Sequence, residues 1–262
     1  MLPGGLFEQG ERLRDWSFAP LTGALEVAIA EAARGQASLP QRITAVLAAA
    51  LGRLGGGEVG SEAVRSLCVA DRQFLMRRLA VTLGQDEDWL SAACTRCGSA
   101  FDVPIRQSEL PVKPAGDGFP FITAETSHGR LRLRVPTGAD QEAIAAVEDP
   151  AEARRRLARR CVVDPLPGPL TPKDLEAIDT ALEEVAPELV TRVQVPCVDC
   201  GHPNELYLDP YLCLSRASTE IFADVHALAS HYHWSQREIL SLPRERRQLY
   251  IDLIDKARGM AG

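Results

Sequence analysis

Two short cysteine motifs constrain the fold of this chain more than any other feature of its sequence. "CTRCG" covers residues 94–98 and "CVDCG" covers residues 197–201, so each motif has the spacing Cys-x-x-Cys followed by glycine. A turn of this kind presents two sulfurs to one metal ion, and four thiolates complete the tetrahedron that structural zinc prefers. The predicted ligands of one shared Zn²⁺ ion are Cys94, Cys97, Cys197 and Cys200.

The residues on either side of each motif indicate β-strands. Apolar residues alternate along 101–105 after the first motif, and along 193–195 and 206–208 around the second. Each motif is therefore predicted to form the turn of a β-hairpin, where Gly98 or Gly201 permits the unusual backbone. Two such hairpins that face one another form a zinc ribbon.

The separation between the motifs is far longer than in compact zinc modules. Closing a loop of about a hundred residues costs roughly 4.7 kcal/mol on the cross-link model. Structural zinc binding contributes on the order of 10–16 kcal/mol in small peptides, which exceeds that cost. The long loop is thus compatible with one site, particularly if the intervening segment folds by itself.

Two other interpretations of the cysteines are open. The motifs could bind metal at two separate or intermolecular sites, or they could hold no metal and serve as redox pairs or buried thiols. The start "MLPGGLFEQGERLRDW" shows no secretory signal, so we expect a cytoplasmic protein, in which disulfides are rare. Two near-identical motifs between strands are not the redox pattern either, so one shared zinc is favoured.

The chain shows no recognisable catalytic set. It contains no nucleophile elbow, no HExxH motif and no convincing Ser/His/Asp combination. Four cysteine ligands also leave no open position for a catalytic water, so we expect the zinc to be structural. The other cysteines, Cys68, Cys161 and Cys213, are interpreted as small buried apolar residues. We therefore expect a protein that is not an enzyme and has no small-molecule substrate.

Charge and hydropathy limit the partners. The net charge of −7 makes nucleic acid an unlikely partner, and no apolar stretch reaches the roughly 18 residues of a membrane span. The densest basic cluster, "ARRRLARR" at 153–160, lacks interleaved aromatic residues. We interpret it as a solvated face or as a contact for an acidic protein partner. His231 and His233 have no third ligand nearby and are interpreted as helix-end residues.

Periodicity and capping signals place the remaining elements. They predict a helix from Pro40 to Leu54, a strand from Val64 to Cys68, a helix from Arg72 to Leu83 capped by Asp71, a hairpin turning at His128-Gly129, and a helix starting at Thr171. The predicted fold is α+β: a zinc ribbon made by two distant Cys-x-x-Cys hairpins, an α/β insert between them, and helical N- and C-terminal segments. The expected units are 1–62 (N-terminal helical segment), 63–106 with 190–210 (split zinc-ribbon domain), 107–189 (inserted α+β subdomain) and 211–262 (C-terminal helical segment).

The C-terminal segment contains a candidate partner-binding surface. Ser235 and Glu238 form a capping-box pattern that places Trp234 over Ile239. The helix after Pro243 then carries one apolar stripe beside arginines, which either packs on the preceding helix or docks a partner protein. The predicted partner-binding residues are Arg244, Arg247, Leu249, Tyr250, Leu253 and Ile254.

The order of several motifs resembles a known family. "VADRQFLMRRLAVTLG", "CTRCGSAFDV", "LRLRVPTGADQEAI", "CVDCG" and "YHWSQREILSLPRERRQLYIDLI" follow one another along the chain. This order is similar to that of baseplate-hub and tail-assembly proteins of contractile-tailed phages, and of their relatives in bacterial contractile injection systems. The resemblance runs from about Val64 to Ile254, and residues 1–62 have no counterpart in it.

The resemblance implies a non-enzymatic role in building the baseplate, with other baseplate, hub or tail proteins as partners. It implies either a component of the phage-tail-like particle or a cytoplasmic chaperone that leaves it. Two competing classes are a zinc-ribbon nucleic-acid-binding or regulatory protein and an unrecognised enzyme. Steeply salt-dependent binding of DNA or RNA would favour the first class, and an open pocket with a perturbed acid or base would favour the second.

Overall fold

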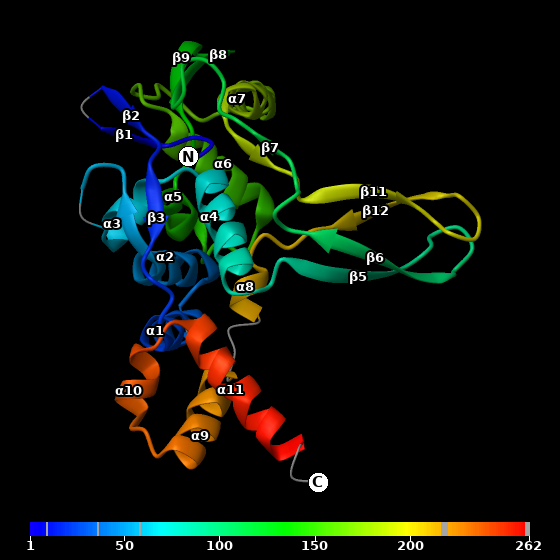
Figure 1. Cartoon of the computed structure of the whole chain (residues 1–262). Coiled ribbons are helices and arrows are strands. Elements are labelled where there is room, and N and C mark those ends of the chain that lie inside the picture. Colours follow the sequence, from blue (N-terminus) through cyan, green and yellow to red (C-terminus); the bar gives the residue numbers. More distant parts are fainter. Residues whose placement is uncertain (9, 36, 58, 216–219, 260–262) are drawn as a thin grey trace.

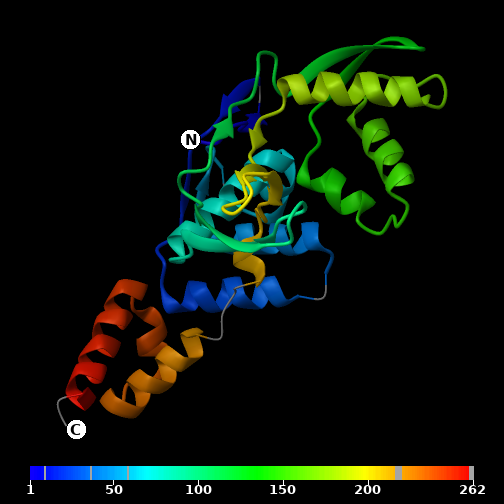
Figure 2. The same ribbon diagram turned by 90° about the vertical axis from the view of Figure 1, so that its right-hand side faces the viewer.

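The computed structural model describes residues 1–8, 10–35, 37–57, 59–215 and 220–259 of the chain. Helices are combined with small antiparallel sheets of two strands each, in agreement with the predicted mixture of helices and strands. Figure 1 shows a central group of helices from which two long hairpins project to one side. In Figure 2 the C-terminal helices lie at one end of this group, and the segment between the cysteine motifs extends at the other.

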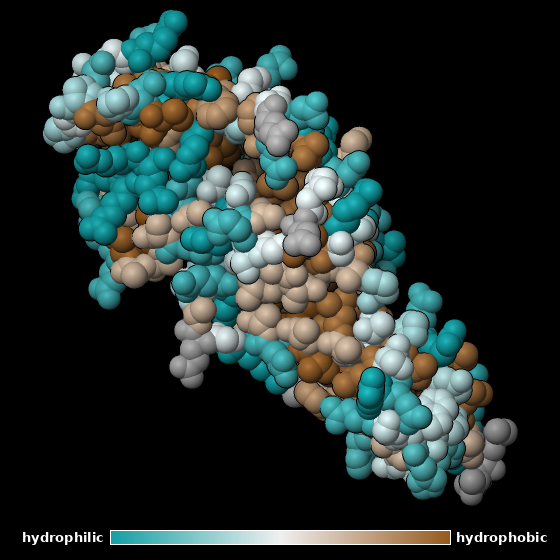
Figure 3. All heavy atoms as spheres, turned by 90° about the vertical axis from the view of Figure 1, so that its left-hand side faces the viewer, coloured by the Kyte–Doolittle hydropathy of each residue, from teal (hydrophilic) through white to brown (hydrophobic). Residues whose placement is uncertain are grey.

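The central group, which we call the helical body, is formed by the first 83 residues and carries the largest apolar core, which Cys213 also joins. Its helices are α1 (Gly23–Arg34), α2 (Leu39–Ala50), α3 (Ser61–Ser66) and α4 (Val69–Thr82). Its strands are β1 (Leu6–Glu8), β2 (Glu11–Leu13), β3 (Trp16–Phe18) and β4 (Leu51–Leu54), paired β1–β2 and β3–β4. Leu47, Leu75 and Met76 are fully buried at its centre. Figure 3 shows further apolar atoms gathered on the surface of this body.

Helix α2 is shorter than the sequence predicts. It ends at Ala50, and the residues expected to form its last turn form β4 instead. Leu51 and Leu54 are buried in the main core. A Cβ atom at Gly52 would lie 3.1 Å from Ala19, so glycine permits the close approach of the chain that follows β3. Pairing with a strand some 35 residues earlier therefore outweighs the local helical pattern.

The residues before α4 also differ from the prediction. Helix α3 covers the start of the segment Val64–Cys68, which was expected to be a strand. Cys68, and not Asp71, is the N-cap of α4. The fully buried Asp71 carboxylate accepts hydrogen bonds from the backbone N–H groups of Gly4 and Gly5, each at 2.7 Å. An aspartate near the start of a helix can cap the helix or accept hydrogen bonds from another segment. Gly4 and Gly5 are too remote in sequence for a local pattern to reveal the second role.

The segment between the cysteine motifs, which we call the insert, has a core of its own. Its elements are β7 (Val112–Lys113), β8 (Phe121–Thr126), β9 (Gly129–Arg134), α5 (Gly138–Ile144), α6 (Pro150–Cys161), α7 (Pro172–Val185) and β10 (Glu188–Leu189). The β8–β9 hairpin has the predicted turn, and α7 starts with a capping box formed by Thr171 and Asp174. Leu131, Leu133 and Ile178 are buried between the hairpin, α6 and α7.

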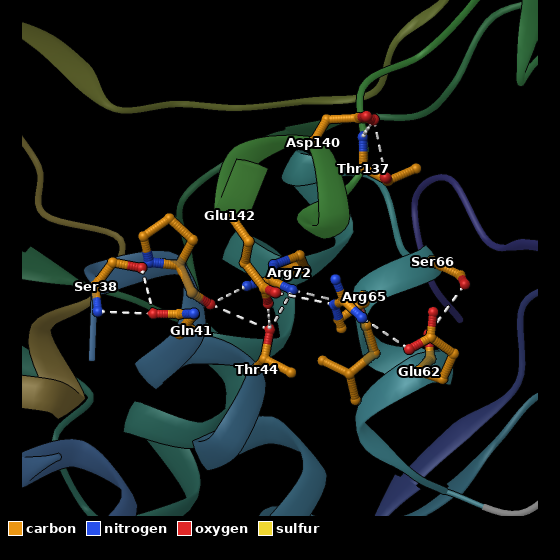
Figure 4. Close-up of polar contacts among 12 residues, drawn as sticks. Ser38, Gln41, Thr44, Glu62, Arg65, Ser66, Arg72, Thr137, Asp140 and Glu142 are labelled. Carbon is orange, nitrogen blue, oxygen red and sulfur yellow. Dashed lines mark hydrogen bonds and ion pairs between the residues drawn. The ribbon is translucent and has the colours of Figure 1, made fainter. Parts of the chain in front are cut away.

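A buried polar junction connects the insert to the helical body (Figure 4). The hydroxyl of Thr44 on α2 donates to Glu142 on α5 at 2.5 Å and accepts from Arg72 on α4 at 2.9 Å. Arg65 on α3 donates to the second oxygen of Glu142 at 2.9 Å. The insert is thus attached to the body as well as folded on itself. The main core likewise crosses the boundary expected after residue 62, because α4 packs with the N-terminal helices.

The C-terminal segment is helical, as predicted, in the residues that the structure describes. It consists of α8 (Leu212–Ser215), α9 (Glu220–Tyr232), α10 (Gln236–Ser241) and α11 (Arg244–Gly259). Ser235 and Glu238 form the predicted capping box of α10. Trp234 packs against the cluster that contains Ile239, as the staple interpretation requires. None of the described helices has both the length and the apolar character of a membrane span.

Candidate metal centre

The two cysteine motifs lie at the tips of neighbouring hairpins. Strand β5 (Glu87–Ala93) pairs with β6 (Ala100–Arg106), and β11 (Arg192–Pro196) pairs with β12 (Pro203–Tyr207). These are the strands that the alternation of apolar residues predicts, and both hairpins point away from the body in Figure 1. A small apolar core between them includes Phe101. Packing of the hairpins therefore brings together two motifs that are a hundred residues apart.

The two turns have the same backbone structure. In the first, the N–H of Cys94 donates to the carbonyl of Ser99 at 2.8 Å, and the N–H of Gly98 donates to the carbonyl of Cys94 at 2.9 Å. In the second, Cys197 donates to His202 at 2.8 Å and Gly201 donates to Cys197 at 2.9 Å. The two glycines have φ values of +76° and +69°, which a residue with a Cβ atom rarely adopts. The glycine after each motif is thus a requirement of the turn.

The four sulfurs lie close enough together to bind one ion. The ligand atoms of all four cysteines are within 4.8 Å of one another. The Sγ atoms of Cys94 and Cys200 are 3.6 Å apart, and those of Cys97 and Cys197 are 3.7 Å apart. A tetrahedral zinc with bonds of about 2.3 Å separates its sulfurs by about 3.8 Å, whereas a disulfide requires about 2.05 Å. The arrangement fits a single metal ion with four sulfur ligands and does not fit two disulfides.

The thiols do not ionise equally in the absence of a cation. Hydrogen bonds, the strongest from the backbone of Cys97, lower the pKa of Cys94 to about 6. A hydrogen bond from the backbone of His202 lowers the pKa of Cys200, but contacts with the sulfur of Cys97 and with the other thiols outweigh it and raise the value to about 12. Sulfur atoms held this close repel one another as thiolates, so a bound cation is needed to stabilise all four in that form.

Polar side chains behind the sulfurs connect the two turns to each other. The buried side chain of Asn204 accepts a hydrogen bond from the backbone N–H of Thr95 at 3.0 Å. Its amide nitrogen donates to the carbonyl of His202 at 2.8 Å. Nearer the surface, the hydroxyl of Ser99 donates to the carboxylate of Asp199. These contacts fix the position of one turn relative to the other.

Sequence reasoning missed the role of Asn204. This residue follows the first cysteine of its motif by seven positions, as Phe101 does in the other motif. Phe101 fills the apolar core between the hairpins, whereas Asn204 directs a polar side chain into the same region. A polar residue at a strand position where the first motif has an apolar one is the signal that identifies it.

The three cysteines outside the motifs lie away from the sulfur cluster. Cys68, Cys161 and Cys213 are all buried, as predicted, although the thiol of Cys68 also donates to the carboxylate of Asp71 at 3.3 Å. Burial raises the pKa of each thiol, to about 12 for Cys161 and Cys213. None of the three belongs to the cysteine cluster that could hold a metal ion among the described residues.

The predicted partner-binding residues do not form one surface. Ile254 is buried and Tyr250 is half-buried, and both belong to the apolar cluster of the C-terminal helices. The exposed fractions of Leu249 and Leu253 are 57% and 47%. The apolar stripe is thus divided: one part packs on α9 and α10, and the other faces solvent.

The two arginines of that prediction face inward, toward α1. Arg247 is fully buried, forms an ion pair with Glu26 on α1, and lies 3.6 Å from the carboxylate of Asp224 on α9. Arg244 lies 3.6 Å from the second oxygen of Glu26. The prediction that Arg247 and Ile254 lie on an exposed docking surface is therefore wrong, because other parts of the chain enclose both side chains. Arg247 instead attaches the C-terminal helices to the body.

Comparisons with protein families and with known proteins give no match for this chain: no family model, no curated protein and no solved structure matches it. The resemblance to tail-assembly proteins accordingly stays a prediction from the sequence. The arrangement of the cysteines is the part of the predicted site that the structure supports.

Proposed function

We propose that the four cysteines bind one zinc ion and that the metal is structural. The closed set of four sulfurs, at distances that match the edges of a tetrahedron, is the observation that carries this proposal. Zinc is the metal that combines this geometry with thiolate ligands and has no redox chemistry of its own. With four protein ligands, the ion has no vacant position for a substrate or a catalytic water. Its role is to join the two hairpins into a zinc ribbon.

The protein itself is proposed to be a non-enzymatic structural or assembly factor of a contractile phage-tail or injection-system baseplate. The metal site supports the non-catalytic part of this proposal, and the ordered motifs between Val64 and Ile254 support the assignment to contractile tails. Hairpins that project from a helical body, stiffened at their tips by zinc, suit a protein that works by binding other proteins (Figure 1). Its expected partners are other baseplate, hub or tail proteins.

Deletion of the gene in its native host tests the assembly role. The expected result is the loss of intact contractile particles in electron micrographs, with restoration by the wild-type gene. A gene with both Cys94→Ser and Cys197→Ser should fail to restore them, whereas Val198→Ala should restore them, because Val198 is exposed in the same turn and offers no ligand. Normal particles in the deletion strain would refute the assembly role.

The competing nucleic-acid role gives a different result in the same strains. If the protein is a zinc-ribbon nucleic-acid binder, the purified protein should bind DNA or RNA with steep salt dependence. The variant with both Cys94→Ser and Cys197→Ser should lose this binding. Particle assembly should continue in the deletion strain. Baseplate proteins that co-purify with the wild-type chain, in the absence of nucleic acid, are expected under the assembly role.

A further inference from the structure

The basic cluster of the insert lines a pocket of about 330 Å³ between α6 and the loop before α7. Arg155, Arg156 and Arg159 line it from the helix, and Leu166 and Leu170 line it from the loop. Helix α6 packs against α7 in the part of the molecule farthest from the C-terminal helices (Figure 2). The pocket thus combines cationic and apolar groups on an accessible part of the insert.

The ion pairs of α6 leave positive charge at this pocket. Arg154 and Arg160 point to other partners, since they pair with Asp179 at 2.6 Å and with Asp140 at 2.8 Å. Arg155 and Arg156, in contrast, share one carboxylate, that of Glu152, at 3.0 and 2.7 Å.

Asp149 offers Arg155 a further, longer contact of 3.7 Å, while its carboxylate also caps the start of α6. Arg159 makes no ion pair with any residue that the structure describes. The pocket lining therefore contains three guanidinium groups and one carboxylate, a local excess of two positive charges. This excess is opposite in sign to the net charge of the chain, which is −7.

We infer that this pocket binds a short acidic segment of a partner protein, with one apolar side chain of that segment held between Leu166 and Leu170. Guanidinium groups bind carboxylates through paired hydrogen bonds, and the three arginines are spaced along about one turn of exposed helix. The inference rests on the charge and shape of the insert and is independent of the contractile-tail proposal.

Nucleic acid fits the pocket less well than an acidic peptide. No aromatic side chain lines the pocket to stack on a base. The apolar wall of leucines has no role in binding a phosphate backbone. It suits a leucine or isoleucine side chain of a peptide, which buries apolar area on binding.

The test uses a fluorescein-labelled peptide of twelve residues with repeating Glu-Leu-Asp units, titrated with the full-length protein at low salt. We expect saturable binding by fluorescence anisotropy that weakens as ionic strength rises. Arg159→Glu and Arg156→Glu should each weaken it about tenfold, because each replaces an attraction with a repulsion at close range. Both side chains are exposed, so folding should be unchanged by circular dichroism.

The matched control is Arg53→Glu on β4, an exposed arginine of the helical body that does not line the pocket and whose replacement changes the net charge equally. It should change the affinity by less than about twofold at moderate salt. A peptide with serine in place of leucine should bind about fivefold more weakly, in keeping with the burial of one apolar side chain. No binding at about 1 mM protein, an equal effect of Arg53→Glu, or tighter binding of duplex DNA than of the peptide at the same salt would each overturn the inference.

Discussion

At the residue scale, the metal centre depends on more than its four cysteines. Polar side chains behind the sulfurs hold the two turns together. We expect Asn204→Ala to reduce the free energy of unfolding by about 1–3 kcal/mol, because the N–H of Thr95 loses its acceptor and the carbonyl of His202 keeps only the N–H of Cys197. The variant should also release zinc to a chelator faster than the wild type. Urea unfolding and a colorimetric chelator assay measure the two effects. Ser99→Ala, in the exposed contact, is the control with a smaller effect.

Two glutamates that contact the same arginine provide a second test at this scale. Glu142 is nearly buried and holds Arg65 and Thr44, whereas the side chain of Glu62 is 82% exposed. Glu142→Ala should cost about 1–3 kcal/mol, because it removes the acceptor of Thr44 and Arg65 and takes a negative charge away from the buried Arg72. Glu62→Ala should cost less than about 1 kcal/mol. Equal unfolding free energies for the two variants would contradict the interpretation of Figure 4 as a structural junction.

Asp140 gives the fold a dependence on pH. Burial raises the pKa of this carboxyl, but hydrogen bonds from Arg134 and Thr137 outweigh burial and lower it to about 2. Since the folded pKa lies below the unfolded value of about 3.9, ionisation stabilises the fold by about 2 kcal/mol above pH 4. This stabilisation is lost as the pH falls toward 2, with about half of it gone at pH 3.

The variant Asp140→Asn isolates that contribution. Its stability should be lower than that of the wild type at pH 6, and the difference should shrink by about 1 kcal/mol when both are measured at pH 3. Loss of zinc and protonation of other carboxylates affect both proteins and cancel in the difference. If the difference in stability stays constant between pH 6 and pH 3, the pKa of Asp140 is not lower in the folded state than in the unfolded state.

At the element scale, the sequence pattern predicts those helices, hairpins and turns whose structure depends on neighbouring residues. The hairpins around both cysteine motifs, the turn of the β8–β9 hairpin and the capping boxes at Thr171 and Ser235 all depend on neighbouring residues, and all are present. The end of α2 and the start of α4 depend on the N-terminal residues, which pair with β4 and bind Asp71. Those contacts are remote in sequence, so periodicity alone could not predict them.

Helix α11 shows the same limit and supplies a prediction. The sequence pattern predicts one apolar stripe, but Tyr250 and Ile254 pack inward while Leu249 and Leu253 are exposed. Tyr250→Ala with Ile254→Ala should reduce stability by about 2–5 kcal/mol through the loss of buried side chains. Leu249→Ala with Leu253→Ala should change stability by less than about 0.5 kcal/mol per residue. Thermal unfolding followed by circular dichroism compares the two pairs.

The exposed pair also tests the partner-binding hypothesis for this helix. If α11 docks a partner, Leu249→Ala with Leu253→Ala should fold normally, keep its zinc and fail to support particle assembly in the native host. A normally folded variant that supports assembly would show that this face of α11 is not an interface. The inward-facing pair cannot give this answer, because a loss of folding would remove assembly as well.

At the scale of the whole molecule, three sets of contacts hold distant segments together. The Arg65–Glu142 junction joins the insert to the body, and the Arg247–Glu26 pair joins the C-terminal helices to α1. The sulfur cluster joins the two hairpins that flank the insert. Of these, the sequence predicted only the last, because the Cys-x-x-Cys spacing indicates metal chemistry wherever the partner motif lies. The two ion-pair contacts join charges that no pattern in the sequence connects.

The central claim is that four sulfurs from two distant hairpins bind one zinc ion. X-ray absorption at the zinc edge, on protein purified without added metal, tests it most directly. We expect one zinc per chain with a first shell of four sulfurs at about 2.3 Å and no nitrogen or oxygen. A shell with fewer sulfurs, a shell that includes nitrogen or oxygen, or protein that carries no zinc would contradict the account.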